Sequence, residues 1–458
     1  MAKEKQVFFC KECGYESSKW LGQCPGCRAW NSFVEEKVSV KSKVTGRTVP
    51  VSDRPKATSI KNVSSSEETR IKTRIGELDR VLGGGIVKGS LVLVGGDPGI
   101  GKSTLLLEMC KNLVESDTKV LYVSGEESVS QIKSRAVRLG ITEGTVMEER
   151  LMLLSDNDMD NIESQIDSLK AEVVIIDSIQ TIMSNDIDNA PGTVSQVREV
   201  TARLLQIAKQ KDAAVFIVGH VTKEGTVAGP RTLEHMVDSV LYFEGDESGG
   251  FRMLRANKNR FGSTNEIGVF NMTDSGLEEV SNPSEFFLSG RPANSSGSVV
   301  VCTVEGTRAL LVEIQALVTD SSFNMPRRTA VGLDYNRVNL LIAVLEKRGG
   351  FSLSGCDCYV NIAGGIKLND PSTDLGVLCS IASSFRDKPI DSHTCIIGEI
   401  GLAGEIRGVR NITQRAKEAV KLGYTRLIIP KSNKSKDIDQ LGADVTYVSY
   451  ITEALEAL

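Results

Sequence analysis

A phosphate-binding loop is the feature that most restricts how this chain can fold. Residues 95–103 read Gly-Gly-Asp-Pro-Gly-Ile-Gly-Lys-Ser and fit the pattern G-x-x-x-x-G-K-S. A short apolar run at 91–94 precedes the loop, and a leucine-rich segment without Gly or Pro follows it at 105–109. This order predicts a buried parallel strand, a loop and a helix, which is the arrangement of a nucleotide site.

The phosphate-binding loop predicts which residues bind the nucleotide. Its backbone N–H groups can approach a polyphosphate at the positive end of the helix. We expect Lys102 to bridge the β- and γ-phosphates and the Ser103 hydroxyl to bind Mg²⁺, so that ATP and Mg²⁺ are cofactors. The residues expected to bind the nucleotide are Gly96, Asp97, Pro98, Gly99, Ile100, Gly101, Lys102, Ser103 and Thr104.

Carboxylates follow two other apolar runs. The run at 173–176 ends in Asp177, which we expect to organise Mg²⁺ together with Ser103. A second run ends at Ser124 and is followed by Glu126 and Glu127, at a sheet edge where open α/β folds bind ligands. One of these glutamates could polarise the attacking water, and Glu126 is favoured. The alternative is a solvated acidic turn.

Less specific signals lie near a third strand. His220 follows an apolar run at 214–218 and either contacts the γ-phosphate or has no such role. Two polar segments rich in Gly, Asn or Pro, at 184–194 and 221–231, could be mobile loops. The second of them contains Thr222, Lys223 and Arg231.

Four of the ten cysteines form two C-x-x-C pairs near the N-terminus. Each pair has a glycine nearby and can form a tight knuckle that points two thiolates at one tetrahedral Zn²⁺. We therefore expect a zinc ribbon with the ligands Cys10, Cys13, Cys24 and Cys27. Disulfides are the alternative, and a cytosolic setting disfavours them. The other six cysteines lie mostly in apolar stretches and are expected to be small core residues.

Length and patterning predict several domains. A chain of 458 residues is too long for one core, and strand-like runs alternate with helical patterns, so we expect an α/β fold with a parallel sheet. No apolar run approaches the length of a membrane span, and the net charge of −5 leaves nucleic-acid binding to local basic surfaces. The expected parts are a ribbon at 1–35, a linker at 36–68, an ATPase domain at 69–285, a linker at 286–297 and a further domain at 298–458.

Several motifs together resemble one family. Besides the cysteine pairs and the phosphate loop, they are Leu-Asp-Arg-Val-Leu-Gly-Gly-Gly at 78–85, Tyr-Val-Ser-Gly-Glu-Glu-Ser at 122–128 and Lys-Asn-Arg-Phe-Gly at 258–262. With them, essentially the whole chain is similar to the bacterial RadA/Sms DNA repair family. The resemblance implies a zinc ribbon, a RecA-like ATPase core and a C-terminal α+β domain like that of Lon proteases.

The resemblance also implies an activity and partners. It implies a DNA-dependent ATPase of homologous recombination and repair, an ATP-driven ring that moves on single-stranded DNA and promotes branch migration beside the recombinase RecA. Single-stranded and branched DNA and RecA are the expected partners, and we expect homo-hexamers. The expected location is the cytoplasm, at the nucleoid, with no membrane association.

The Lys258-Asn259-Arg260 stretch is similar to the motif by which DnaB-type replicative helicases reach a neighbouring subunit's nucleotide. Two cations one residue apart in a strand point to the same side, and a guanidinium supplied by a neighbour stabilises a γ-phosphate in transfer. We therefore expect Lys258 and Arg260 to act catalytically in the neighbouring site. A basic strand that binds DNA phosphates, or one that is merely solvated, is the alternative.

The C-terminal region resembles the proteolytic domain of Lon proteases through residues 398–404 and 427–430. Alignment with that family leaves Ser372 in the serine position, but Thr413 stands where the catalytic lysine should be and Lys417 lies one helical turn away. Because Thr cannot activate a serine, we expect a scaffold for assembly and DNA contact. Two arginine sets could form a basic surface there, Arg327 with Arg328 and Arg407 with Arg410 and Arg415.

Two other classes of function compete with the DNA motor. One is a regulatory RecA-like ATPase that acts on protein partners, as the circadian clock proteins do. The other, which the Thr413 position disfavours, is an ATP-dependent protease.

Overall fold

The computed structural model describes residues 4–39, 59, 70–141, 147–220, 232–245, 251–264, 266–292, 294–321 and 325–458. The chain forms two compact units, one made of Met1–Glu244 with Gly250–Glu279 and the other of Gly245–Gly249 with Val280–Leu458. Most of the linker expected at 36–68, and the whole loop expected at 221–231, lie outside the described residues. In the described segments, no helix combines the length and apolar character that crossing a membrane requires.

The first unit begins with a small antiparallel sheet in the order β2-β1-β3. Strand β1 pairs with both of its neighbours, and the two cysteine knuckles lie in the turns between the strands. The strands are β1 (Glu4–Cys10), β2 (Glu16–Ser17) and β3 (Phe33–Ser39).

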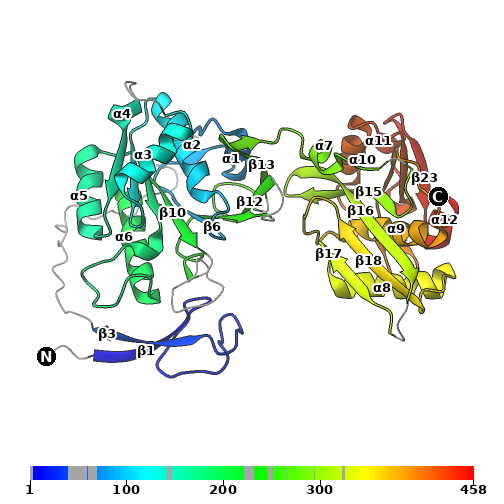
Figure 1. Cartoon of the computed structure of the whole chain (residues 1–458), viewed down its shortest axis with the longest axis horizontal. Helices are drawn as coiled ribbons and strands as arrows, with labels where there is room; N and C mark the ends of the chain where they lie inside the picture. Colours follow the sequence, from blue (N-terminus) through cyan, green and yellow to red (C-terminus); the bar gives the residue numbers. More distant parts are fainter. Residues whose placement is uncertain are drawn as a thin grey trace. The chain divides into compact units, whose positions relative to one another are not determined.

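A nine-stranded sheet forms the rest of this unit, in the order β14-β13-β12-β11-β6-β10-β9-β7-β8 (Figure 1). The six strands from β11 to β8 run parallel to one another, and the other three add an antiparallel edge. The strands are β6 (Leu91–Gly96), β7 (Val120–Ser124), β8 (Leu151–Ser155), β9 (Val173–Asp177), β10 (Ala214–His220), β11 (Ser239–Glu244), β12 (Phe251–Asn259), β13 (Ile267–Thr273) and β14 (Gly276–Glu279).

The parallel strands are apolar on both faces because helices cover both sides. In β6, Val92 and Val94 join a buried cluster with helices α2 and α3, whereas Leu91 and Leu93 join a second cluster with α5 and α6. The helices of this unit are α1 (Gly76–Val81), α2 (Lys102–Glu115), α3 (Val129–Arg138), α4 (Met147–Arg150), α5 (Met159–Leu169) and α6 (Val194–Lys211), with a 3₁₀ turn η3 (Ile179–Thr181). Two short strands, β4 (Arg70–Ile71) and β5 (Ile86–Val87), pair beside α1.

The second unit contains a mixed seven-stranded sheet in the order β17-β18-β16-β15-β19-β22-β23. Its strands are β15 (Ser298–Glu305), β16 (Arg308–Asp320), β17 (Arg328–Val331), β18 (Cys356–Ile362), β19 (Thr394–Ile396), β22 (Arg426–Pro430) and β23 (Asp444–Val448). A hairpin of β20 (Glu399–Ile400) and β21 (Ile406–Arg407) stands apart from this sheet.

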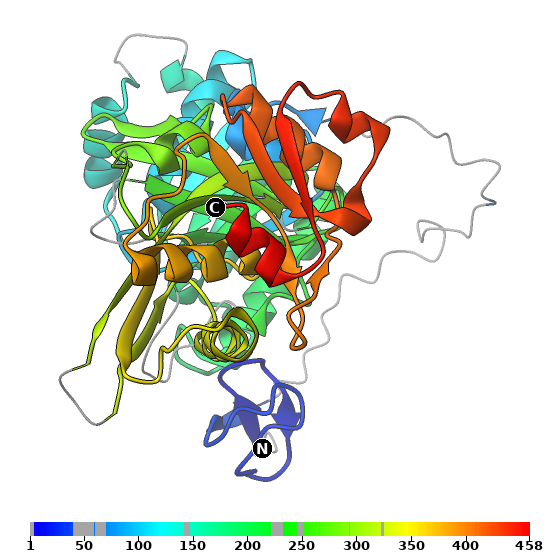
Figure 2. The same cartoon turned by 90° about the vertical axis from the view of Figure 1, so that its right-hand side faces the viewer.

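Helices surround this second sheet, and the last of them, α12, packs against α8 and α9 (Figure 2). Its helices are α7 (Pro283–Leu288), α8 (Tyr335–Gly349), α9 (Asp374–Arg386), α10 (Ile412–Lys421), α11 (Lys436–Asp439) and α12 (Ile451–Glu456), with 3₁₀ turns η5 (Pro371–Thr373) and η6 (Lys431–Asn433). The linker expected at 286–297 therefore starts inside α7, and α7 belongs to the second unit instead of the ATPase domain expected at 69–285.

Candidate functional site

The phosphate loop lies between β6 and α2, as its flanking residues predict. Gly96 and Gly101 both have positive φ, at 148° and 114°, which side chains rarely adopt. A Cβ atom at Gly96 would also lie 3.1 Å from the carbonyl oxygen of Phe243 in β11. The loop thus needs glycine at both ends. Residues 97–100 form its turn, and Ser103 and Thr104 stand in the first turn of α2.

Lys102 opens helix α2 and is 3% exposed. Its ammonium donates hydrogen bonds to the carbonyl oxygens of Gly96, at 2.9 Å, and Asp97, at 2.8 Å. Burial lowers the pKa of Lys102 to about 8, although the negative charges of Asp177, Asp97 and Glu126 oppose this shift. The side chain is therefore held inside the loop by carbonyls that a phosphate group could replace.

Asp177 ends β9 at the carboxyl edge of the sheet, and β10 separates β9 from β6, the strand that leads into the loop. Its register partner in β7 is Ser124. Its Oδ2 accepts a 2.6 Å hydrogen bond from the hydroxyl of Tyr122, a residue that is 1% exposed. Sequence reasoning assigned Tyr122 no role, although a tyrosine in an otherwise apolar strand signals a buried hydroxyl that needs a partner.

The two glutamates after β7 have different surroundings. Glu126 Oε1 accepts a 2.6 Å hydrogen bond from the Ser178 hydroxyl and lies 3.9 Å from Nε2 of His220. Glu127 instead forms a salt bridge with Arg135 on α3. Only Glu126 is therefore directed toward the strand ends that carry Asp177 and His220.

His220 ends β10 and is the register partner of Gly96 in β6. Its backbone carbonyl accepts a hydrogen bond from the side chain of Gln180 at 3.3 Å. Burial and the charge of Lys102 lower the pKa of His220, so the ring favours its neutral form. The loop, Asp177, Glu126 and His220 thus meet at one edge of the parallel sheet.

Lys258 and Arg260 lie at the opposite edge. Lys258 in β12 donates hydrogen bonds to the carbonyl oxygens of Glu234 and Val237, both at 2.8 Å. Arg260, one residue beyond the end of β12, forms a 3.1 Å salt bridge with Asp238. Asp238 exchanges backbone and side-chain hydrogen bonds with Leu91, the first residue of β6.

That position separates both cations from their own phosphate loop. Leu91 and Gly96 are the two ends of β6, and a parallel strand of this length spans roughly 16 Å. The two cations also differ in their position, because Lys258 belongs to β12 whereas Arg260 follows the end of this strand. Arg260 keeps 56% of its side chain exposed.

The motif around these cations packs against a second motif. Asn259 Nδ2 donates to the carbonyl oxygen of Val81 at 3.2 Å, and a Cβ atom at Gly262 would lie 2.9 Å from Cα of Gly83. The segments at 78–85 and 258–262 therefore approach each other at Gly83 and Gly262, where a side chain on either residue would collide with the other segment.

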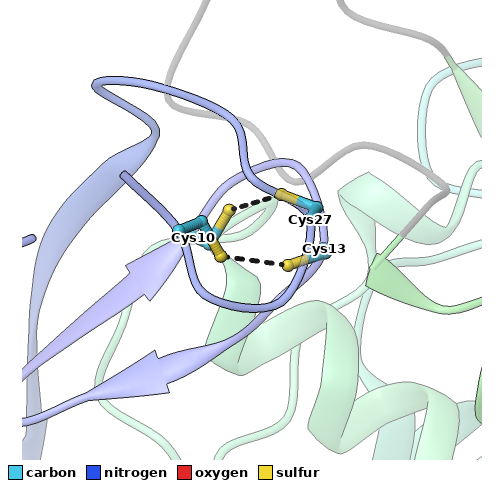
Figure 3. Close-up of side chains that lie close together, drawn as sticks. Cys10, Cys13 and Cys27 are labelled. Atoms are coloured by element: carbon cyan, nitrogen blue, oxygen red, sulfur yellow. Dashed lines mark hydrogen bonds between the residues drawn. The ribbon is translucent and has the colours of Figure 1, made fainter. Parts of the chain in front are cut away.

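The sulfur atoms of Cys10, Cys13 and Cys27 point toward one another in Figure 3, and Cys24 completes the cluster of four ribbon cysteines. The Sγ atoms of Cys10 and Cys27 are 3.6 Å apart, those of Cys13 and Cys24 are 3.5 Å apart, and all four lie within 4.8 Å of each other. A tetrahedral zinc site with Zn–S bonds of about 2.3 Å has edges of about 3.8 Å, so the cluster fits Zn²⁺. In the described residues all ten cysteines are free thiols, so the disulfide alternative finds no support.

Ser372 in the second unit lies beside Arg415, a residue that the sequence analysis assigned to a basic surface. Ser372 is 2% exposed, and its hydroxyl accepts a 2.8 Å hydrogen bond from Arg415. Arg415 also forms a 2.7 Å salt bridge with Asp370. The expectation of a basic surface is wrong for Arg415, because this side chain is buried. In the part of the chain that the structure describes, neither Thr413 nor the exposed Lys417 forms a hydrogen bond with Ser372.

Three family models match the chain. A model described as an AAA domain matches residues 56–226, a rubredoxin metal binding domain matches 8–35, and subunit ChlI of Mg-chelatase matches 322–433. With the sheets described above, these matches confirm the expected fold class of a zinc ribbon, a RecA-like ATPase core and a Lon-like C-terminal domain. They also support Zn²⁺, ATP and Mg²⁺ as cofactors.

Curated relatives align with this chain over nearly its whole length. The chain is 55% identical to the DNA repair protein RadA of Bacillus subtilis (strain 168), over 99% of each chain. It is 52% identical to the DNA repair protein RadA of Listeria monocytogenes serovar 1/2a, over 97% of each chain. A crystal structure of the RadB recombinase matches at 25% identity with a TM-score of 0.37, over 46% of this chain and 99% of that chain.

Proposed function

Because this chain belongs to the RadA family of DNA repair proteins, we propose that it is a ring-shaped, DNA-dependent ATPase that drives recombination. The ATPase domain and the family establish an ATPase of DNA repair. The finer proposal is a hexamer that translocates on single-stranded DNA and promotes branch migration of recombination intermediates. Its partners are single-stranded and branched DNA and the recombinase RecA, at the nucleoid.

The carboxyl edge of the first sheet provides the groups for hydrolysis. ATP binds in the loop 96–104, where Lys102 exchanges its carbonyl partners for phosphate oxygens and Ser103 and Asp177 hold Mg²⁺. Glu126 polarises the attacking water. The salt bridge between Glu127 and Arg135 supports this choice, because it engages the other candidate glutamate.

The position of Arg260 and Lys258 is the observation that supports a ring-shaped assembly. They lie at the opposite edge of the sheet from their own loop, roughly 16 Å away along β6, and Arg260 is more than half exposed. A guanidinium in this position can stabilise a transferring phosphoryl only in another subunit's site. Asp238 holds Arg260 in place until that contact forms.

Mixing two inactive variants tests this assignment. Lys102→Ala removes the loop cation and Arg260→Ala removes the cation supplied to the neighbour, so each homogeneous ring should hydrolyse ATP poorly. In mixed rings, a complete site forms where Arg260 of one variant meets Lys102 of the other, and activity should return. Arg74→Ala is the matched control, because Arg74 is also paired with a carboxylate and 56% exposed.

Arg260→Ala should bind ATP normally, since its charge stabilises the transition state and not the ground state. If mixed rings stay inactive although co-assembly is demonstrated, or if monomers hydrolyse ATP at the wild-type rate, the trans role fails and Arg260 is reassigned to DNA contact.

We further propose that the second unit is a scaffold without peptidase activity. The buried guanidinium of Arg415 beside Ser372 supports this, because arginine stays protonated and cannot accept the serine proton. The expected result is that Ser372→Ala leaves ATP hydrolysis unchanged and that neither protein cleaves casein.

A further inference from the structure

The zinc ribbon exposes both tryptophans of the chain. The sequence contains two, Trp20 and Trp30, and their exposed fractions are 52% and 71%. Large aromatic side chains left in water on a segment this small indicate a binding surface more often than a folding role. Neither indole belongs to the ribbon's own core cluster, which is formed around Cys10, Cys24 and Phe33.

The two indoles flank one glycine. A Cβ atom at Gly22 would lie 3.9 Å from Cη2 of Trp20 and 3.9 Å from Cζ3 of Trp30. Backbone bonds fix this arrangement, because Asn31 N donates to Gly22 O at 2.8 Å and Gln23 forms a β-bridge with Trp30. Both rings therefore lie within van der Waals reach of the same glycine, and the hairpin that carries them is held in register.

The stretch of chain that carries the indoles has only positive charges, although basic and acidic residues are equal in number over residues 4–39. Residues 17–34 contain Lys19 and Arg28, each close in sequence to one tryptophan, and no Asp or Glu. Both cations are exposed, and neither pairs with a carboxylate anywhere in the described parts of the chain. This differs from the rest of the molecule, whose net charge is negative.

The ribbon holds this surface in a fixed place on the first unit. The buried carboxylate of Glu36 accepts hydrogen bonds from the backbone N–H groups of Val194 and Ser195 at the start of α6. Arg198 of the same helix donates to the carbonyl oxygen of Gly14 at 3.0 Å. A ligand on the ribbon is thus connected directly to an ATPase helix.

We propose that Trp20 and Trp30 stack on unpaired bases of single-stranded DNA while Lys19 and Arg28 contact its phosphates. This inference rests on the proposed function and adds a binding surface to it. Stacking tolerates any base, because every base has a π-face, and basic side chains beside the rings follow the phosphate backbone. A protein-binding aromatic patch would be expected to have apolar neighbours, whereas Lys19, Gln23, Arg28 and Asn31, which are exposed, lie close to these tryptophans in sequence.

Indole fluorescence tests the proposal in the full, zinc-loaded chain. Because no other tryptophan exists, emission reports only on this surface. Titration with a short oligothymidylate should quench the emission at stoichiometric saturation. An oligonucleotide of the same length made of abasic sites has the same phosphates but no bases, and it should bind without quenching.

Variants give a second readout through fluorescence anisotropy of labelled DNA. Trp20→Ala and Trp30→Ala should each weaken oligothymidylate binding by about 5- to 100-fold and leave binding of the abasic strand unchanged. Trp30→Phe should retain most of the affinity, since phenylalanine also stacks. Tyr450→Ala is the matched control, because Tyr450 is an aromatic residue of the second unit with 53% exposure. Zinc content confirms that each variant keeps its ribbon.

The outcomes separate this inference from the function on which it rests. If oligothymidylate binds by anisotropy but does not quench the indoles, or if both alanine variants bind it normally, the stacking surface is wrong and the DNA motor remains. If instead these variants lose binding to purified recombinase and keep DNA affinity, the surface serves a protein partner and the proposal is also overturned. If no single-stranded DNA binds by either method, the proposed function itself fails.

Discussion

Lys102 shows how a single buried side chain is prepared for the proposed nucleotide site. Its ammonium is removed from water, and carbonyl oxygens of the loop are its only hydrogen-bond acceptors in the described structure. The carboxylates of Asp177 and Glu126 act on it through their charge alone. Polyphosphate brings several negative charges to the same point, so ATP binding should favour the protonated ammonium.

This predicts that ATP binding takes up a proton at alkaline pH. The pKa of Lys102 without nucleotide is about 8, and bound phosphates raise it, so at higher pH the free protein must gain a proton to bind. ATP affinity should fall by up to about tenfold per pH unit above pH 8 and change little below pH 7. Calorimetry in buffers of different ionisation enthalpy measures the proton uptake directly.

The matched variant is Lys102→Arg, whose guanidinium stays protonated throughout this range. It should bind ATP without proton uptake. Equal uptake in this variant and the wild type would assign the titrating proton to another group, such as His220.

At the scale of elements, the first turn of α6 connects the ribbon to the ATPase sheet. The helix has no side-chain cap at Thr193, and the carboxylate of Glu36 in β3 satisfies its first N–H groups instead. A negative charge at a helix N-terminus is favourable, and the same carboxylate accepts from the Ser195 hydroxyl. A residue of the ribbon thus caps the N-terminus of a helix that packs on the nine-stranded sheet.

Glu36→Ala should therefore loosen the ribbon and the start of α6 together. The buried N–H groups of Val194 and Ser195 lose their acceptor, which costs about 1–3 kcal/mol of local stability. Hydrogen exchange of these two amides should accelerate by about 5- to 100-fold, and the ribbon should become more sensitive to protease.

Glu35→Ala is the control, because Glu35 is the exposed neighbour on β3 and pairs with Phe8 of β1 through the backbone. If both variants exchange alike, the carboxylate of Glu36 does not hold the two elements together.

At the scale of the whole molecule, assembly should depend on the second unit. Rings joined only through nucleotide interfaces lose those contacts on each hydrolysis, whereas a nucleotide-independent scaffold keeps the subunits together. We expect a chain ending at Glu279 to keep the ribbon and the nine-stranded sheet but to dissociate toward monomers at micromolar concentration. At the same concentration we expect the full chain to be hexameric.

Size-exclusion chromatography with light scattering measures this difference, and zinc content with far-UV circular dichroism verifies that the shortened chain is folded. Hexamers of equal stability from the shortened chain would show that the second unit is not needed for assembly.

Much of the candidate site is predicted from the sequence alone, because its signals are local. The phosphate loop, the strand that ends in Asp177 and the two cysteine pairs are each specified within a few residues, where backbone geometry and ligand spacing are short-range. Alternation of apolar runs with helical patterns likewise predicts parallel strands and places their ends at one edge. The α/β class and the zinc ribbon needed no tertiary information.

Tertiary structure decided what depends on partners far apart in sequence. It directed Glu127 to Arg135 and left Glu126 facing Ser178, it buried Arg415 beside Ser372, and it put Tyr122 on Asp177. Charged residues have no periodic signature that distinguishes a buried pair from a solvated face, so the sequence predicted a surface role for Arg415. Position relative to a distant element, and not residue type, determines what these side chains can do.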